Sequence, residues 1–259
     1  MTHDAPRHRS GEPSPRELPI GLPVLRGNGI TCRVRSWPGR PNIAQLVLYH
    51  QSSLPSITDL DRWSTQLSGL GFDRVRTTAM TETSGIRMEA AGFRSVQELV
   101  LLQFDDPRRI PIHHSTVRRL DASGHREAAA VDAAAFDEEW ALDERSIADV
   151  RAATPRHRAR MSLEPGRTEP MVAYAVSGRD ARQGFLQRLA VRPDAQRRGL
   201  GRALVLDSLR WAARWRVDRV LVNTHTTNVA ALSLYEGLGF RRLPERLYVF
   251  ERSLEWSDR

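Results

Sequence analysis

One stretch, residues 184–217, constrains the fold of this chain more than any other. Residues 184–191 are apolar and nearly continuous, which is typical of a buried strand. Apolar residues then recur at helical spacing from Leu200 to about Val217, which predicts an amphipathic helix. Gly199 and Gly201 stand between the two and allow the backbone to turn sharply and to lie bare against a ligand. The sequence therefore predicts a strand, a tight glycine loop and a long helix.

The start of this predicted helix is suited to binding an anion. Free backbone N–H groups and the positive end of the helix dipole meet there, and Arg197, Arg198 and Arg202 add positive charge. The loop lacks the P-loop pattern G-x-x-x-x-G-K, and the chain contains no lysine, which excludes a Walker-type nucleotide site. It also lacks G-x-G-x-x-G, which disfavours a dinucleotide fold. The loop is therefore predicted to hold a phosphate of another kind.

Two motifs resemble the acetyl-CoA-binding blocks of the GNAT superfamily of N-acetyltransferases. The first is Q-x-x-G-x-G at residues 196–201, which resembles the family's loop for the pyrophosphate of the coenzyme. The second is N-x-x-A-x-x-x-Y-x-x-x-G-F at residues 228–240, and it stands where the family places its next block. The resemblance covers residues 112–255. It implies an α/β (α+β) fold with a mixed, mostly antiparallel twisted sheet flanked by helices.

The resemblance also implies an acyltransferase that transfers an acetyl group from acetyl-CoA to a primary amine by direct attack on the thioester. A backbone amide near Val191 is implied as the oxyanion donor, and Tyr235 as the general acid for the leaving thiolate. Instead of acting as the general acid, Tyr235 could be a core aromatic residue on an amphipathic helix. Asn228 either binds the coenzyme or fixes the strand–helix turn. The residues implied to bind the coenzyme are Leu189, Ala190, Val191, Gln196, Arg197, Arg198, Gly199, Leu200, Gly201, Arg202, Asn228 and Tyr235.

The sequence leaves the base that accepts the proton of the amine open. Ribosomal-protein N-terminal acetyltransferases of the family carry a glutamate at the place of Asn223, which cannot take a proton, and this departure argues against that substrate class. His225, Glu138, Glu139 and Asp143 are candidates, the acids because the turn between the first two helices borders the acceptor site in this family. The alternatives are a charged turn that is merely solvated and deprotonation relayed by water.

The region before the GNAT-like part resembles a second, partial copy of the same fold. Short motifs recur at an offset of about 145 residues, which is the mark of an internal repeat. The matching segments are Asp73-Arg-Val with Asp218-Arg-Val, Gly92-Phe93 with Gly239-Phe240, and Glu98-Leu-Val with Arg246-Leu-Tyr. The first copy has no glycine pair, nothing that matches Asn228, and residues 86–88 at the place of Tyr235. We predict a degenerate copy that serves packing or shapes the acceptor cleft; chance similarity of two βαβ units is the alternative.

Composition and spacing predict the domain organisation. Residues 1–28 are predicted to be a proline-rich, disordered tail that lacks the apolar core of a signal peptide. A smaller αβ domain is predicted over 29–106 and the GNAT domain over 112–256. A polar linker at 105–109 joins the two domains. No window approaches 18 uninterrupted apolar residues, so no transmembrane helix is expected. The lone Cys32 excludes an intramolecular disulfide, suits a reducing cytosol and is predicted to be an inert thiol.

The net charge of +8 comes entirely from arginines that are scattered along the chain. Without a basic helix, a stacking-aromatic pattern or a zinc-finger spacing, nucleic acid is not expected as a partner. His113 and His114 lack further ligands at metal-binding spacing, so no metal site is expected. We expect a cytoplasmic monomer or homodimer whose partners are acetyl-CoA and an amine, either a small molecule or a peptide. The rival hypothesis is a non-catalytic acyl-CoA-binding or regulatory protein with tandem domains.

Overall fold

The computed structural model describes residues 22–48, 54–110 and 117–254, and its strands there join into one continuous sheet. The strands are β1 Val24–Gly27, β2 Ile30–Trp37, β3 Arg40–Leu48, β4 Arg74–Thr77, β5 Met80–Thr81, β6 Arg94–Asp105, β7 Arg118–Arg119, β8 Arg156–Leu163, β9 Met171–Asp180, β10 Gln183–Val191, β11 Arg219–His225 and β12 Arg241–Ser253. The α-helices are α1 Ile57–Gly69, α2 Glu82–Ala90, α3 His125–Ala135, α4 Glu144–Ala152, α5 Leu200–Arg214 and α6 Val229–Glu236.

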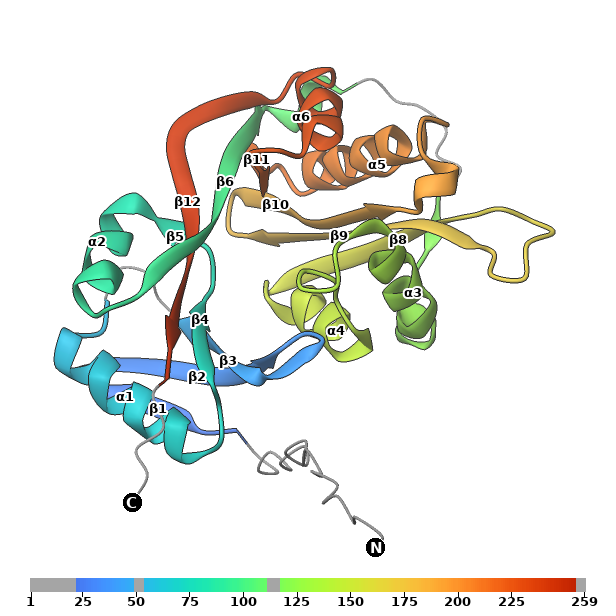
Figure 1. Ribbon diagram of the computed structural model, residues 1–259. Helices are drawn as coiled ribbons and strands as arrows, with labels where there is room; N and C mark the ends of the chain where they lie inside the picture. The colour runs from blue at the N-terminus through green and yellow to red at the C-terminus, as the bar shows by residue number, and fades with distance from the viewer. Residues whose placement is uncertain (1–21, 49–53, 111–116, 255–259) are drawn as a thin grey trace, which may run out of the picture.

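The order of strands across the sheet is β1-β2-β3-β4-β12-β6-β11-β10-β9-β8-β7, with the short β5 beside β12 (Figure 1). Neighbouring strands of the described residues run antiparallel, except for the pairs β3–β4 and β10–β11, which are parallel. Helices flank both ends of this sheet (Figure 1). The predicted α/β class, with a mixed and mostly antiparallel sheet, is therefore confirmed.

In the second half of the chain, residues 117–254, helices cover both faces of the sheet (Figure 1). Helices α5 and α6 lie on one face, where Leu204 and Leu209 of α5 join the buried core. Helices α3 and α4 lie on the other, where Val131 of α3 and Ile147 of α4 pack with residues of β9. Because it is covered on both sides, β9 is buried along its first eight residues, and residues 171–176 form a mostly aliphatic run.

In the first half, residues 22–105, helices α1 and α2 pack on one face of the sheet around Trp63. Helix α1 begins with a capping box: the Ser56 hydroxyl accepts from the Asp59 amide at 3.1 Å, and the Asp59 carboxylate accepts from the Ser56 amide at 3.3 Å. Ser56 with an acid three residues later satisfies two free N–H groups at once.

The internal repeat predicted from sequence is present in the fold. In each half a parallel strand pair joined by a helix (α1, α5) is followed by a second helix (α2, α6) and then a long strand (β6, β12). The turns into the long strands match, with Gly92 at φ 78° and Gly239 at φ 96°. The amide after each glycine bonds to the Met88 carbonyl in the first copy and the Tyr235 carbonyl in the second, both at 3.0 Å. Met88 therefore stands at the place of Tyr235.

The long strands β6 and β12 lie side by side at the centre of the sheet and connect the two halves (Figure 1). Strand β6, from the first half, pairs with β11 of the second half as well as with β12. Strand β12, from the second half, pairs with β4 and places Phe250 in the core of the first half. The domain boundary near residues 106–112 stays a prediction, but these two pairings bring a strand of the first copy directly beside the sheet of the second.

Three predicted segments differ from the structure or fall outside the described residues. The tail predicted over 1–28 was wrong from Val24 onward, because β1 pairs with β2 and Leu25 is buried in the first core. Residues 1–21 lie outside the described part. Residues 111–116, which include His113 and His114, also lie outside the described part. The linker at 105–109 contains a short 3-10 helix, Pro107–Arg109.

Cys32 lies on β2 and its side chain is fully buried in the first core. Burial raises the pKa of its thiol to about 12. Because the thiolate is the reactive form, we expect the native protein to resist labelling by a disulfide reagent at pH 8 and to be labelled fully after unfolding in guanidinium. Rapid labelling of the native protein would contradict this.

The same raised pKa has a consequence for stability against pH. The folded-state pKa of Cys32 lies above its unfolded value of about 8.5, so the protonated thiol stabilises the folded state fully below about pH 8.5. This contribution is lost as the pH rises toward the folded-state value, by up to about 1.4 kcal/mol per pH unit. Unfolding curves of the wild-type protein and Cys32→Ala between pH 8 and 11 measure the difference.

Candidate functional site

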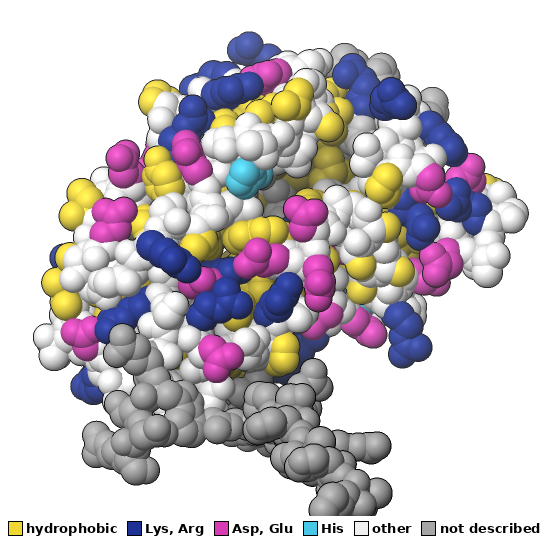
Figure 2. Space-filling model, in the orientation of Figure 1, with side chains coloured by type: hydrophobic (Ala, Val, Ile, Leu, Met, Phe, Trp, Pro, Cys, Tyr) yellow, Lys and Arg dark blue, Asp and Glu magenta, His cyan; other side chains and the backbone are white. Residues whose placement is uncertain are grey.

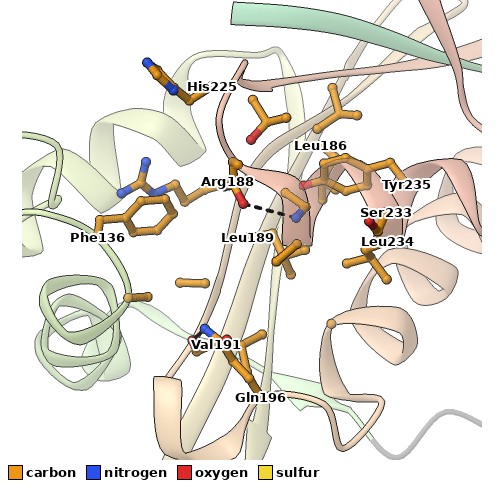
Figure 3. Close-up of a pocket in the computed structure, with 18 of the residues that line it drawn as sticks. Phe136, Leu186, Arg188, Leu189, Val191, Gln196, His225, Ser233, Leu234 and Tyr235 are labelled. Carbon is orange, nitrogen blue, oxygen red and sulfur yellow. Dashed lines mark hydrogen bonds between the residues drawn. The ribbon is translucent and has the colours of Figure 1, made fainter.

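A cavity of about 1010 Å³ opens in the second half between β10, β11, α5 and α6. Figure 3 shows Phe136 and Arg188 on one side of it, with Leu234 and Tyr235 on the other. Gln196 and His225 lie toward its two ends (Figure 3). Strand β6 of the first half also reaches this cavity, where it contributes Gln97 and Leu99. The two copies of the repeat therefore share one cavity.

The cavity exists because β10 and β11 diverge. Their parallel pairing covers only residues 183–185 of β10 with 219–221 of β11, although both strands continue well beyond it. The first copy differs, because β3 and β4 stay paired along the whole of β4, from Arg74 to Thr77. An opening between parallel strands is thus found in the second copy and not in the described strands of the first.

The divergence leaves backbone groups of β10 facing the cavity. The Arg192 amide donates to the Val172 carbonyl at 2.9 Å, which fixes the hydrogen-bonded positions of the β9–β10 ladder. Because these positions alternate along an antiparallel pair, the peptide groups of Leu189 and Val191 point away from β9. The Gln196 side chain agrees with this direction, since its Nε2 donates to the Val191 carbonyl at 3.3 Å. The amides of both residues are therefore directed toward the open side of the strand.

The N-terminus of α5 faces the same cavity and carries no side-chain cap. Gly199 is its N-cap residue at φ 79°, and Arg197 also adopts a left-handed conformation at φ 60°. A Cβ on Gly201 would lie 3.2 Å from the Leu234 side chain, so the absence of a side chain here lets the helix start approach α6 closely. The first-turn N–H groups of the helix, together with the dipole behind them, form an anion-binding end. Non-glycine residues with positive φ occur preferentially at such functional turns.

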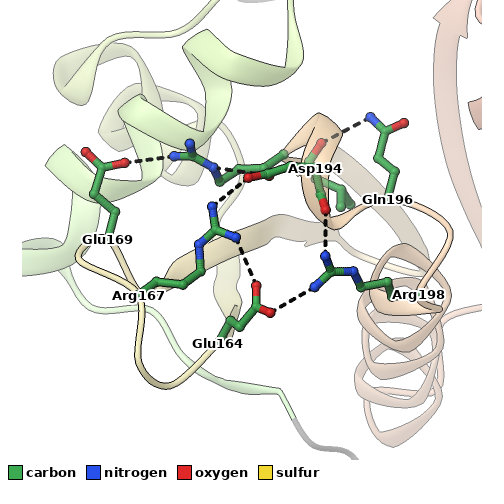
Figure 4. A network of polar contacts seen from close by, with 8 residues as sticks. Glu164, Arg167, Glu169, Asp194, Gln196 and Arg198 are labelled. Atoms are coloured by element: carbon green, nitrogen blue, oxygen red, sulfur yellow. Dashed lines mark hydrogen bonds and ion pairs between the residues drawn. The ribbon is translucent and has the colours of Figure 1, made fainter.

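The arginines of this loop separate into two groups. Arg197 and Arg202 line the cavity, are exposed, and have no ion pair among the described residues. Arg198, which the sequence grouped with them, does not line the cavity. Its guanidinium donates to Glu164 Oε1 at 2.9 Å and to the Asp194 carbonyl at 2.7 Å (Figure 4). Arg198 therefore holds the loop in place, while Arg197 and Arg202 supply positive charge to the cavity.

A network of charged side chains holds this loop against the β8–β9 connection (Figure 4). Arg167 contacts Glu164 at 3.1 Å and Asp194 at 2.6 Å, so it joins the connection to the residues that precede Gln196. Arg192 pairs with Glu169 at 2.8 Å. Several shared partners make such a network more effective than isolated surface ion pairs.

Tyr235 and Asn228 lie on α6, on the side of the cavity opposite Arg188. Tyr235 is 4% exposed, and burial raises the pKa of its phenol well above the ordinary value. No described residue hydrogen-bonds its hydroxyl. Asn228 is the N-cap residue of α6, and its Oδ1 accepts from the Ala231 amide at 3.1 Å. Asn228 thus fixes the strand–helix turn, which was one of the two roles predicted, and it also lines the cavity.

The opposite wall rests on a buried group around Asp132 of α3. Its carboxylate accepts from Arg188 Nε at 2.8 Å, from the Leu142 amide at 2.7 Å and from the Tyr174 hydroxyl. The Arg188 guanidinium carbon also lies 3.6 Å from the centre of the Phe136 ring. Asp132 is fully buried, so these partners compensate its charge inside the protein. This group has no local sequence signature, since its members come from separate segments of the chain.

The structure distinguishes among the four candidate bases. His225 lines the cavity, with its Nδ1 2.7 Å from the Thr227 hydroxyl. The other three do not line it. Asp143 caps α4 through the Ser146 amide at 2.7 Å, Glu139 pairs with Arg76 at 2.6 Å, and Glu138 is 83% exposed.

Sequence reasoning did not single out Asp137, although it belongs to the acidic turn that was noted. Asp137 lines the cavity, and its carboxylate has no ion pair among the described residues. Asn223, at the place where some family members carry a glutamate, also lines the cavity. The described residues thus bring two ionisable groups, Asp137 and His225, to the cavity wall, and the Nδ1 of His225 already accepts from the Thr227 amide at 3.2 Å.

Charge and metal chemistry elsewhere on the molecule add little to this site. On the face shown in Figure 2, arginine and acidic side chains are intermixed. Ion pairs among the described residues include Arg35–Asp149 and Arg40–Glu138. Within residues 22–48, 54–110 and 117–254, no group of three or more His, Cys, Asp or Glu side chains is arranged to hold a metal ion. No helix in this part of the chain is long and apolar enough to cross a membrane.

Comparison with known proteins points to one family. Residues 134–240 match the model of the acetyltransferase (GNAT) family. A mycothiol acetyltransferase from Acidothermus cellulolyticus is 47% identical over 53 residues, which are 20% of this chain and 16% of that protein. A ribosomal protein bS18-alanine N-acetyltransferase from Escherichia coli K12 is 37% identical over 70 residues, 27% of this chain and 47% of that protein. The chain thus spans less than half the length of either curated relative.

A solved structure resembles the whole described fold. It is a tandem GNAT protein from the clavulanic acid biosynthesis pathway, with a TM-score of 0.61 and 14% sequence identity over 91% of this chain and 83% of that one. At this identity the likeness concerns the fold alone. It agrees with the internal repeat seen in the two halves.

Proposed function

We propose that this protein transfers an acetyl group from acetyl-CoA to a primary amine, because residues 134–240 match the model of the acetyltransferase (GNAT) family. The observation that carries the proposal is the coincidence, in one cavity, of an uncapped helix N-terminus, a strand edge with outward amides and a buried tyrosine. We assign each of these three features to a different part of the coenzyme thioester.

The cavity accommodates the coenzyme in one direction. We assign the diphosphate to the first-turn amides of α5, where Arg197 and Arg202 add charge and Gly199 and Gly201 leave room. The pantetheine amides then run along the open edge of β10 as an added strand, beginning beside Val191, the residue of β10 nearest the loop. This direction carries the thioester past Val191 to Leu189, opposite α6.

The chemistry follows from this placement. The outward amide of Leu189, two residues before the Val191 amide that the resemblance implied, donates a hydrogen bond to the thioester carbonyl and stabilises the oxyanion that forms when the neutral amine attacks. The carbon–sulfur bond then breaks, and the departing thiolate takes a proton from the Tyr235 hydroxyl. The amine gives up one proton to His225, to Asp137 or to water. The products are the acetylated amine and free coenzyme A.

An amine-panel assay tests the proposed activity. Thiol release from acetyl-CoA is followed with a peptide carrying N-terminal alanine, an amino sugar, an aliphatic diamine and an aromatic ethylamine as acceptors. We expect amine-dependent release with at least one of them, and mass spectrometry of the product then identifies an amide. Saturable coenzyme binding without release for any amine favours the non-catalytic acyl-CoA-binding alternative.

The assignment of the diphosphate predicts the effect of charge at the loop. The double change Arg197→Gln and Arg202→Gln is expected to weaken coenzyme A binding about 30-fold, because each removes a charge-assisted contact to phosphate worth roughly 1 kcal/mol at an exposed position. The loss should shrink at high salt. Arg214→Gln, at the far end of α5, is the matched control and should leave the affinity unchanged. Equal affinities of the double variant and the wild type for coenzyme A would show that the diphosphate binds elsewhere.

A further inference from the structure

The turn between α3 and α4 forms part of the cavity wall and is attached to the first half of the protein. Phe136, Asp137 and Trp140 of this turn line the cavity. The turn has few hydrogen bonds of its own, among them those from the Trp140 and Ala141 amides to the Asp137 carbonyl at 2.8 and 3.0 Å. Its position therefore depends on what lies behind it.

Behind the turn lies Arg76 of β4, which is 1% exposed. Its Nη2 donates to Glu139 Oε1 of the turn at 2.6 Å, and its Nε donates to Glu251 Oε2 of β12 at 2.9 Å. The guanidinium carbon is 4.5 Å from the centre of the Trp37 ring and 5.1 Å from that of Trp140. A buried guanidinium with these partners joins a strand of each half to the turn.

Trp37 of β2 strengthens the same attachment. Its Nε1 donates to the Glu139 carbonyl at 2.7 Å, and its ring meets the Trp140 ring edge to face at 5.2 Å. Trp37 is buried with Leu99 of β6, which itself lines the cavity. The first copy, which lacks the glycine loop, thus contacts the cavity wall from behind through Arg76 and Trp37 and directly through β6.

We propose that Arg76 and Glu139 position the turn 136–142 for the acceptor amine, so that the degenerate first copy shapes the acceptor end of the site. This inference rests on the proposed acetyltransferase function. Neither residue lines the cavity, so they are positioning residues rather than catalytic ones. The coenzyme end of the cavity, at α5 and β10, is held by separate contacts around Glu164 and Asp194. Changes at Arg76 or Glu139 should therefore leave coenzyme binding unchanged.

The test uses Glu139→Ala in the full-length protein, because Glu139 is partly exposed and Arg76 keeps Glu251 as a partner, so the variant is expected to fold. With the best acceptor of the amine panel, the KM for the amine should rise about tenfold, since small displacements of a substrate-positioning wall have large effects. The KM for acetyl-CoA should stay within about twofold. Hydrogen exchange of the amides of residues 137–142 should become faster in the free protein.

Two further variants separate positioning from other roles. Glu139→Gln keeps an oxygen that accepts from Arg76, so this variant should largely restore the amine KM and the slow hydrogen exchange. If Glu139 were instead the general base, Glu139→Gln would be as inactive as Glu139→Ala. Asp149→Ala is the matched control. It removes the 3.0 Å pair with Arg35, another contact between the two halves, and should leave the turn and the amine KM unchanged.

An unchanged amine KM and unchanged exchange in Glu139→Ala overturn the inference, as does an equal effect in Asp149→Ala. If the wild-type protein binds coenzyme A but acetylates no amine, the proposed function fails. The exchange comparison then still decides whether Glu139 holds the turn, so the two failures are distinguishable.

Discussion

Replacing Tyr235 by phenylalanine is expected to lower kcat for amine acetylation by at least about 100-fold, while coenzyme A binds within about twofold of the wild-type affinity. The change removes one hydroxyl and leaves the ring that packs against Phe240, at a centre distance of 5.5 Å. The loss should therefore concern proton transfer to the thiolate and leave the shape of the cavity intact.

Two features of Tyr235 suit it to donate a proton. Burial raises the pKa of its phenol above the ordinary value, so the hydroxyl stays protonated throughout the neutral range and to about pH 10. None of the described residues hydrogen-bonds the hydroxyl, which leaves it available to a ligand in the cavity. We therefore expect the wild-type kcat to show no loss of the acid group between pH 7 and 9.

Tyr248→Phe is the matched control, because Tyr248 lies on β12 and does not line the cavity. Its kcat should equal that of the wild type. A Tyr235→Phe enzyme with full kcat would show that the thiolate leaves without this acid, and Tyr235 would then be a core aromatic of α6. Circular dichroism and coenzyme titration of the variant distinguish that outcome from misfolding.

The second large effect concerns stability. Asp132→Ala should lower the free energy of unfolding by about 3–5 kcal/mol, because it leaves the Arg188 cation inside the protein without its carboxylate. It also removes the acceptor for the Tyr174 hydroxyl and the Leu142 amide, which are buried or half-buried. For a chain of this length such a loss corresponds to a fall in Tm of about 10 °C.

Urea unfolding at neutral pH measures the difference, and the slope with denaturant should be unchanged if both states keep their exposed surface. The control is Asp218→Ala, which removes an exposed ion pair with Arg182 and should cost no more than about 1 kcal/mol. Equal stabilities of Asp132→Ala and Asp218→Ala would mean that the charge at Asp132 is solvated or replaced in solution.

Local patterns in the sequence predicted the parts of the fold that depend on local chemistry. The strand–glycine–helix unit at 184–217 was visible because apolar spacing and the glycine pair are contiguous, although α5 ends at Arg214 rather than near Val217. The repeat was visible because its turns reuse the same residues, Gly92 and Gly239. The pairing of β6 with β12 across the two halves was not visible in the sequence. Two strands more than 100 residues apart leave no local signal of their pairing.

The same distinction applies to the site. Loop residues such as Gln196, Gly199 and Gly201 were found because their spacing is a motif, and the structure brings them together at one end of the cavity. The direction of Arg198 was missed, because it depends on Glu164, which is 34 residues away. Glu139 was considered as a base on the strength of its charge, but its partner Arg76 comes from the first copy. Side-chain partners of this kind require the tertiary structure.

The central claim, that the α5 end of the cavity holds the diphosphate of a coenzyme thioester, is tested most directly by calorimetric titration of the full-length protein with coenzyme A. We predict saturable binding of one coenzyme per chain, weakened by added salt. The absence of saturable binding at millimolar coenzyme A would contradict the account.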